Sequence, residues 1–295
     1  MSPEELSRAL DVVRALADEA SLLAIDAFRR GGAVRKKGAV DLLTETDLRV
    51  EALVRERLRD AFPEHDVIGE EGDDHATGER PIWFVDPIDG TTNFAHGHPQ
   101  FSIALGLLVD GVPTLGVVAA PALGVTWSGA IGVGAIRCWR HAGGGVSAQR
   151  DQPPLGSSER RGQPPLERVE ACRVSSVATL ADSLCATGFP YDRWTNDDDN
   201  TREHRAFLKR GQGVRRCGSA ALDCCFVADG TYDVYWEQRL KPWDVCAGIA
   251  LILAAGGRAT SYAGEPADPR HGELVATNGL VHDEALAVLA QVRGR

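Results

Sequence analysis

The sequence contains no apolar stretch long enough to cross a membrane. Its best candidate, Val245 to Ala255, falls well short of the roughly 20 residues that a spanning helix needs. Charged side chains also interrupt the first thirty residues throughout, which is incompatible with the apolar region of an export signal. We therefore expect a protein that neither contacts a membrane nor is exported, and that resides in the cytoplasm.

Closely spaced cysteine pairs are also missing. The seven cysteines form an odd set without any C-x-x-C spacing: Cys138, Cys172, Cys185, Cys217, Cys224, Cys225 and Cys246. Such spacing supports neither a disulfide framework nor a zinc site. We expect reduced and mostly buried thiols.

Positive charge is in deficit. The 295 residues include 32 Lys and Arg against 42 Asp and Glu, a net charge of −10, which argues against direct binding to nucleic acid. Hydrophobic residues make up 43% and charged residues 25% of the chain, an ordinary balance for a globular protein. The length suits one large domain or two smaller ones.

Helical and strand-like segments alternate along the chain. Apolar spacing predicts a long helix from a capping box at Ser2 to the glycines at 31–32, and a second helix from about Asp47 to Pro63. A buried strand is expected at 82–85, and 102–109 is expected to pair with 114–120 as a hairpin around Asp110-Gly111, with a turn of two residues or more. Later strands at 169–174, 232–236 and 273–277 alternate with helices at 200–210, 219–228, 245–255 and 283–293. This alternation predicts layered α/β packing.

A segment rich in glycine and proline divides the chain. Residues 143–165 offer almost no apolar side chains to bury, so we expect a flexible surface insertion there. It would separate an N-terminal α+β half, 1–142, from a C-terminal α/β half, 166–295.

Two carboxylates follow the predicted strand at 82–85 directly. Asp86 and Asp89 precede a Gly90-Thr91-Thr92 turn, and carboxylates at the end of a strand point into the crevice where α/β folds bind ligands. Held together, such groups repel each other unless a cation lies between them. Oxygen ligands without His or Cys favour Mg²⁺ over zinc, and the turn offers backbone N–H groups to a phosphate. The segment therefore indicates phosphoryl chemistry.

A third carboxylate, Asp244, lies far along the chain. It follows Pro242, which favours the first turn of a helix, so Asp244 is expected at the N-terminus of the apolar helix at 245–255. An Asp there is more often a partner of the helix dipole than a metal ligand. Without further support, both interpretations stay open.

Three separate motifs resemble the inositol monophosphatase family. They are D-P-I-D-G-T-T-N-F at 86–94, Gly69-Glu70-Glu71 upstream, and Pro242-Trp243-Asp244 downstream. The resemblance covers about residues 5–140 and 168–290, and the insertion departs from the family's usual pattern. It implies an α/β fold, the alternating α-β-α-β-α sandwich of the inositol monophosphatase and fructose-1,6-bisphosphatase type. It also implies a homodimeric, lithium-sensitive, Mg²⁺-dependent phosphatase.

The resemblance assigns two to three magnesium ions to these motifs. Glu70, Asp86 and the carbonyl of Ile88 would hold the first ion. Asp86, Asp89 and Asp244 would hold the second, and Glu70 would help a third ion through water. One ion would activate the attacking water and another would stabilise the leaving oxygen.

The catalytic water is assigned to a separate pair of residues. The segment 42–47 resembles the family's block in which the final Asp, here Asp47, accepts a hydrogen bond from Thr91. Asp47, Thr91 and Glu70 would thus be catalytic, and Gly90 and Thr91 would bind the phosphate. Considered without the family, Asp47 is a helix N-cap.

The substrate is assigned by weaker motifs. The segment Gly218, Ser219, Ala220 resembles the family's polyol-facing turn, and Glu237 has the spacing of the Glu that binds inositol hydroxyls. With Asp89 and Asp244, these residues would bind the substrate. A buried acid beside an anionic substrate is best explained by hydroxyl donors on the ligand, which favours a polyol phosphate over a nucleotide.

The leading hypothesis is therefore hydrolysis of myo-inositol 1-phosphate or a related small polyol or sugar monophosphate. Histidinol-phosphate phosphatase is an alternative, because related branches of the family use the same metal scaffold. A role of another class, a non-enzymatic association with the transcription machinery through a protein partner, also remains open.

Overall fold

The computed structural model describes residues 1–30, 34–36, 42–72, 80–140 and 167–294. The predicted insertion at 143–165 lies outside these described residues. No helix in the described ranges is both long enough and apolar enough to cross a bilayer.

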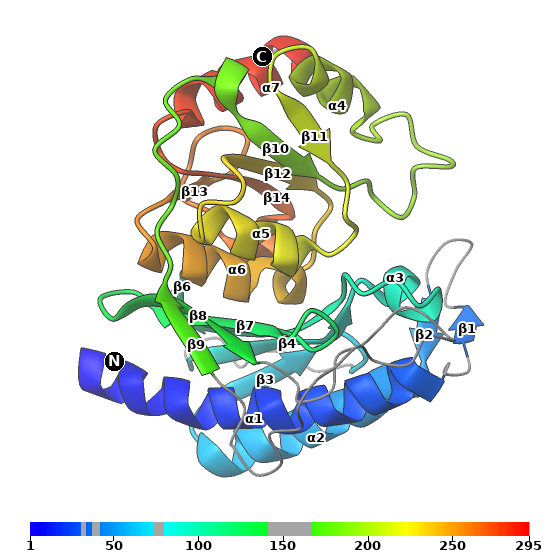
Figure 1. The fold of residues 1–295 in the computed structure, drawn as a ribbon, viewed down its shortest axis with the longest axis vertical. Coiled ribbons are helices and arrows are strands. Elements are labelled where there is room, and N and C mark those ends of the chain that lie inside the picture. Colours follow the sequence, from blue (N-terminus) through cyan, green and yellow to red (C-terminus); the bar gives the residue numbers. More distant parts are fainter. Residues whose placement is uncertain (31–33, 37–41, 73–79, 141–166, 295) are drawn as a thin grey trace, which may run out of the picture.

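Helices and sheets alternate in five layers (Figure 1). An outer pair of helices covers a seven-stranded sheet, a central pair lies between that sheet and a five-stranded sheet, and a third pair covers the far side. The pairs are α1 (Pro3–Arg30) with α2 (Glu45–Ala61), α5 (Ala220–Ala228) with α6 (Pro242–Ala254), and α4 (Thr201–Leu208) with α7 (His282–Arg293). The predicted α-β-α-β-α sandwich is confirmed.

The larger sheet has the order β3-β4-β5-β6-β7-β8-β9, in which β3 and β4 are parallel and all other neighbours are antiparallel. The strands are β3 (Asp66–Gly69), β4 (Ile82–Asp89), β5 (Ser102–Val109), β6 (Val112–Ala120), β7 (Val125–Ala130), β8 (Gly134–Arg140) and β9 (Glu167–Ala171). Strand β9 follows the insertion in sequence but pairs with β8. The chain therefore completes the first sheet before it builds the second.

The smaller sheet has the order β11-β10-β12-β14-β13. Its strands are β10 (Leu184–Thr187), β11 (Gly213–Arg215), β12 (Val234–Gln238), β13 (Arg258–Thr260) and β14 (Glu273–Thr277). The remaining elements are short: β1 (Val34–Lys36) pairs with β2 (Leu42–Thr44), α3 (Thr91–Ala95) follows β4, and two 3₁₀ turns span Leu180–Asp182 and Pro269–His271.

Two local predictions differ in extent from the structure. The strand expected at 82–85 continues to Asp89, and its pairing with β5 shifts register between Asp86 and Asp89. Pro87 fits this irregular stretch because no regular ladder hydrogen bond is required there. The hairpin turn contains only Asp110 and Gly111, with φ of 50° and 79°, as a tight turn between right-twisted strands requires.

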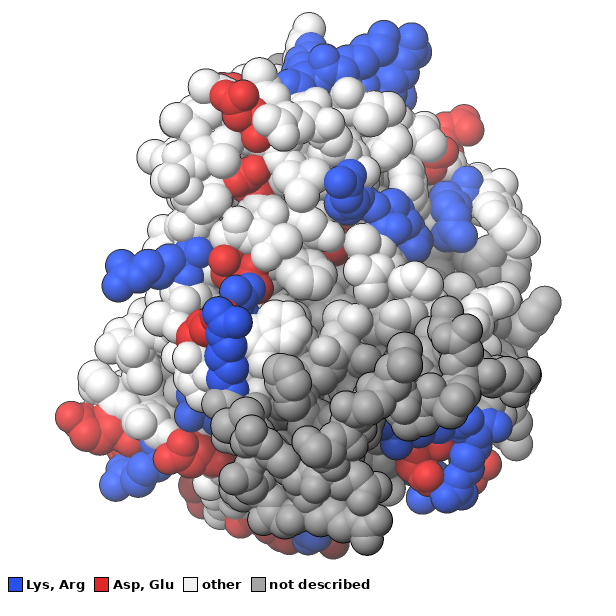
Figure 2. All heavy atoms as spheres, in the orientation of Figure 1, with Lys and Arg blue, Asp and Glu red and all other residues white. Residues whose placement is uncertain are grey.

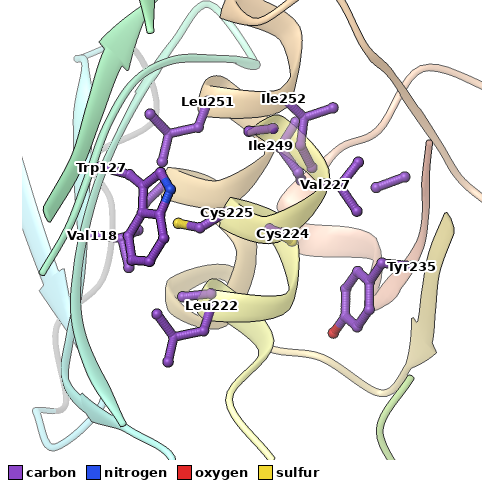
Figure 3. Close-up of a cluster of buried hydrophobic side chains, with 14 of the residues drawn as sticks. Val118, Trp127, Leu222, Cys224, Cys225, Val227, Tyr235, Ile249, Leu251 and Ile252 are labelled. Carbon is purple, nitrogen blue, oxygen red and sulfur yellow. The ribbon is translucent and has the colours of Figure 1, made fainter. Parts of the chain in front are cut away.

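The central helices are packed from both sides. In Figure 3, Trp127 and Val118 of the seven-stranded sheet and Tyr235 of the five-stranded sheet surround apolar side chains of α5 and α6. All seven cysteines are free thiols, and five of them are buried. Burial raises the pKa of the buried Cys224 and Cys225 thiols, so they act as small apolar groups in this core.

Helix α6 lies unusually close to the sheet because β5 and β6 present glycines to it. A Cβ added at Gly106 would lie 2.5 Å from the backbone nitrogen of Ala247, and one added at Gly116 would lie 2.1 Å from the Ala247 oxygen. The two glycines therefore determine how closely α6 packs against the sheet. Helix α6 carries Asp244 in its first turn.

We expect Gly116→Ala to lower the free energy of unfolding by about 2 kcal/mol or more, because a backbone atom cannot yield to the added methyl group. Urea unfolding of the purified variant measures this loss. Gly213→Ala is the matched control, since its added Cβ would meet side-chain atoms alone, the end of Arg215 at 3.2 Å and Leu184 Cδ1 at 4.0 Å. An equal loss in both variants would contradict the close approach of α6.

Candidate active site

A pocket of about 760 Å³ is lined by residues of both sheets and of the helices between them. Every predicted site residue except Asp47 lines this pocket: Glu70, Asp86, Ile88, Asp89, Gly90, Thr91, Gly218, Ser219, Ala220, Glu237 and Asp244. Residues separated by up to 174 positions in sequence, Glu70 and Asp244, thus share one cavity.

Asp86 lies at the centre of the acidic side of this pocket and is 2% exposed. Burial raises its pKa well above the usual value, and the charges of Glu70, Asp89 and Asp244 raise it further. One carboxylate oxygen, Oδ1, accepts a hydrogen bond of 3.0 Å from the backbone N–H of Ile88. These acids are therefore near neighbours in a medium that strengthens their repulsion.

Asp89 connects the two halves of the chain. Its Oδ2 accepts hydrogen bonds from the Ser219 hydroxyl, from the Ala221 N–H at 2.8 Å and from the Ser102 hydroxyl at 3.3 Å. Among the described residues, its Oδ1 accepts a hydrogen bond from the Ala220 N–H alone, at 3.2 Å. Burial raises the pKa of Asp89 to about 6 although these hydrogen bonds oppose the shift.

Asp244 lies in the first turn of α6, as expected of a partner of the helix dipole, and it also lines the pocket. Its Oδ2 accepts the backbone N–H of Lys241 at 2.7 Å, which ties the start of α6. Burial raises its pKa well above the usual value, with the charges of Asp89 and Glu70 adding to the shift against the Lys241 hydrogen bond. A residue that only balanced the helix dipole would not need to lie in a pocket with other acids.

The donor set of this pocket fits a hard cation. Asp86, Asp89 and Asp244 each use one oxygen for strong local hydrogen bonds, while the other oxygen accepts at most one weak bond from a described residue. Among the described residues, no three His, Cys, Asp or Glu side chains converge on a single point. The like charges thus share the pocket without a preformed coordination geometry, and a divalent cation would offset their repulsion.

Asp47 and Thr91 meet behind the pocket. Asp47 is in the first turn of α2, and Thr91 is the first residue of α3. The Thr91 hydroxyl lies 3.5 Å from Asp47 Oδ1, at the long limit of a hydrogen bond, and 3.0 Å from the Ile88 carbonyl oxygen. The structure thus brings Asp47 and Thr91 close to each other, the Thr91 hydroxyl also reaches the Ile88 carbonyl oxygen, and the catalytic and metal-binding roles of these residues stay predictions.

Sequence reasoning missed the residues that hold Glu70. Glu51 of α2 is 4% exposed, and its Oε2 accepts the backbone N–H of Glu71 at 2.8 Å while its Oε1 accepts Arg55 at 2.7 Å. Gly69 allows this approach, since a Cβ there would lie 2.3 Å from the Glu51 carboxyl carbon. The loop that carries Glu70 is thus anchored on α2, a link between distant residues that no local motif signals.

The pocket lining includes a second group of charges. The Glu237 carboxylate accepts the Tyr235 hydroxyl at 2.7 Å and lies where a Cβ of Gly188 would be. Asp223 and Arg216 also line the pocket and were not predicted. A signal for Asp223 was present, since it is the one charged residue within the apolar helix α5.

Charges of both signs are mixed on the molecular surface. On the face shown in Figure 2, Lys and Arg occur in separate groups among acidic and uncharged side chains, so the residues described on that face form no continuous basic band. The expected lack of direct nucleic-acid binding stays a prediction.

Glu237 generates a pH dependence of stability. Burial raises its pKa from 4.5 to about 7, so between these values the native state holds a proton that the unfolded chain has released. Stability must therefore fall as pH rises through this interval. Between pH 4.5 and pH 7.5 in metal-free buffer, we expect the free energy of unfolding of the natural protein to fall by about 2 kcal/mol more than that of Glu237→Gln. Urea unfolding at pH 4.5, 5.5 and 7.5 measures the difference, and parallel curves for the two proteins would contradict it.

Comparison with known proteins agrees with this geometry. The model of the inositol monophosphatase family matches residues 5–294. An inositol-1-monophosphatase of Synechocystis sp. is 35% identical over 291 residues, which are 98% of this chain and 91% of the relative. A putative Nus factor SuhB of Neisseria meningitidis serogroup B is 33% identical over 85% of each chain. The solved inositol monophosphatase of Anabaena (Nostoc) sp. superimposes with a TM-score of 0.79 at 34% identity, over 97% of both chains. This chain is a member of the inositol monophosphatase family.

Proposed function

We propose that this protein is a Mg²⁺-dependent phosphomonoesterase that hydrolyses myo-inositol 1-phosphate or a related small polyol or sugar monophosphate. The observation that carries the proposal is the burial of Asp86 in one pocket with Glu70, Asp89 and Asp244, where each charge disfavours the others. Such an arrangement is costly for a protein without a cationic ligand. The identity to the Synechocystis inositol-1-monophosphatase supports the reaction.

The metal assignment follows the carboxylates. Glu70, Asp86 and the carbonyl of Ile88 would hold one ion, Asp86, Asp89 and Asp244 would hold a second, and Glu70 would help a third through water. Oxygen donors alone favour magnesium over a softer metal. When bound, the ions lower the pKa of the attacking water and stabilise charge on the leaving oxygen.

The remaining chemistry belongs to the chain itself. Asp47 Oδ1 lies 3.5 Å from the Thr91 hydroxyl and competes with the Ile88 carbonyl oxygen, at 3.0 Å, for its single hydrogen. With that hydrogen donated to either oxygen, the lone pairs of Thr91 Oγ1 accept a hydrogen bond from the attacking water. Glu70, which lines the same pocket, would help to orient this water. The backbone N–H groups of Gly90 and Thr91, where the chain turns from β4 into α3, bind the phosphate oxygens.

The second group of charges selects the alcohol portion of the substrate. Glu237 is a strong acceptor for hydroxyl hydrogens, and Gly218, Ser219 and Ala220 present small groups to the same space. An anionic leaving group would face the Glu237 carboxylate, whereas a polyol donates hydrogen bonds to it. We therefore favour a polyol over a nucleotide.

Loss of one metal ligand should abolish catalysis. We expect Asp89→Asn and Asp244→Asn to lower kcat by about 10³-fold or more at saturating Mg²⁺, because each change removes a charge that holds the metal. Phosphate release from myo-inositol 1-phosphate measures the effect, and EDTA should abolish the activity of the natural protein. The control is Asp283→Asn on α7, whose carboxylate is 87% exposed and paired with Arg258. Full Mg²⁺-dependent activity in Asp89→Asn or Asp244→Asn would refute the ligand assignment.

A substrate panel tests the choice of alcohol. We expect kcat/KM to be higher for myo-inositol 1-phosphate than for histidinol phosphate or a nucleoside monophosphate, and we expect Li⁺ to inhibit the reaction. A preference for histidinol phosphate would replace the substrate assignment and leave the phosphatase chemistry intact. Light scattering tests the accompanying proposal that the protein is a homodimer.

A role in transcription is a second candidate because the Neisseria relative is named a putative Nus factor. A chromosomal Asp89→Asn mutant distinguishes the two roles, since this change should remove turnover while the protein still folds. Normal growth of this mutant, combined with impaired growth of a deletion strain, would favour the non-enzymatic role.

A further inference from the structure

The pocket contains a buried carboxylate with one oxygen that has no hydrogen-bond partner among the described residues, and this side chain lies outside the set of residues used so far. Asp223 is 1% exposed, and its Oδ1 accepts no hydrogen bond from any residue that the structure describes. An unsatisfied buried acceptor destabilises the folded state, and more so when it is charged, because the group loses its hydrogen bonds to water without gaining others. A protein that retains such a group without a function would forgo this stability.

Helix capping does not explain Asp223. It lies in the first turn of α5, where an acid ordinarily accepts the free backbone N–H groups. Here those groups already have acceptors: the N–H groups of Ala220 and Ala221 donate to Asp89, and the N–H of Leu222 donates to the Ser219 hydroxyl, at 3.4 Å. The start of α5 therefore offers Asp223 no donor.

Ion pairing does not explain it either. Arg216 is the positive group that acts on Asp223, but the two side chains form no salt bridge in the described structure. Burial raises the pKa of Asp223 well above its usual value, and the charges of Glu237 and Asp89 raise it further. Asp223 therefore shares the pocket with the predicted metal-binding acids and the predicted polyol-binding acid.

We propose that Asp223 is a specificity-determining residue whose carboxylate accepts a hydrogen bond from a ring hydroxyl of the polyol substrate. This inference rests on the proposed function. Asp223 lines the same cavity as Glu237 and Gly218, so a polyol seated there brings hydroxyl donors to both acids. A ligand with a second anionic group at this end would face two carboxylates and bind poorly.

The test compares two substrates that share the phosphate and differ in the alcohol, myo-inositol 1-phosphate and phenyl phosphate. We expect the ratio of their kcat/KM values to fall about ten-fold or more in Asp223→Leu, mainly through a higher KM for the inositol substrate. Asp223→Asn keeps a neutral acceptor, so the ratio of the two kcat/KM values should fall less in this variant. The midpoint of thermal unfolding should not decrease in Asp223→Leu, because the change removes an unpaired buried carboxylate.

Cys224→Ala is the matched control, because Cys224 is the next residue of α5 and its side chain lies in the core (Figure 3). It should leave the substrate ratio unchanged. An unchanged ratio in Asp223→Leu, or an equal fall in Cys224→Ala, would overturn the inference. If the natural protein itself does not prefer the inositol substrate, the proposed function fails instead, and the two failures are thus distinguished.

Discussion

The repulsion of carboxylates confined between two sheets is the constraint around which this molecule is built. Asp86 and Asp89 are buried and Asp244 is half-buried in the same pocket, where their charges act on one another, and none of them forms a salt bridge with a described Lys or Arg. The fold counters this cost with apolar burial on every side, through α6 packed onto the glycines of β5 and β6 and the core around Trp127. A binding site of this kind needs a large scaffold because the site itself opposes folding.

Local order in the sequence predicted the acidic side of the site well. The residues from Asp86 to Thr91 are close in the chain, so a strand end followed by a glycine turn fixed their relative positions in advance. Asp47 was placed opposite Thr91 only through the family resemblance, because nothing within a single segment relates α2 to α3. The layered fold was likewise predictable, since the long helices and strands have clear periodicity.

Features formed by contacts between distant segments were not predictable in this way. Glu51 reads as an ordinary surface acid of an amphipathic helix, and only the structure brings it to the backbone of Glu71. Strands such as β11 and β13 have three residues each, too few for an alternating pattern to be recognised, and they exist because longer neighbours pair with them. The role of Asp223 depends on which amides Asp89 occupies, a property of the assembled protein alone.

Asp89 also has a consequence for partial chains. Its hydrogen bonds to Ser219, Ala220 and Ala221 join residues about 130 positions apart, and Asn93 adds a bond to the carbonyl of Cys217 across the same boundary. Neither half of the chain alone supplies all the residues that line the pocket. A nascent or truncated chain that ends before Cys217 therefore lacks the partners of Asp89 and Asn93 and has only part of the pocket wall.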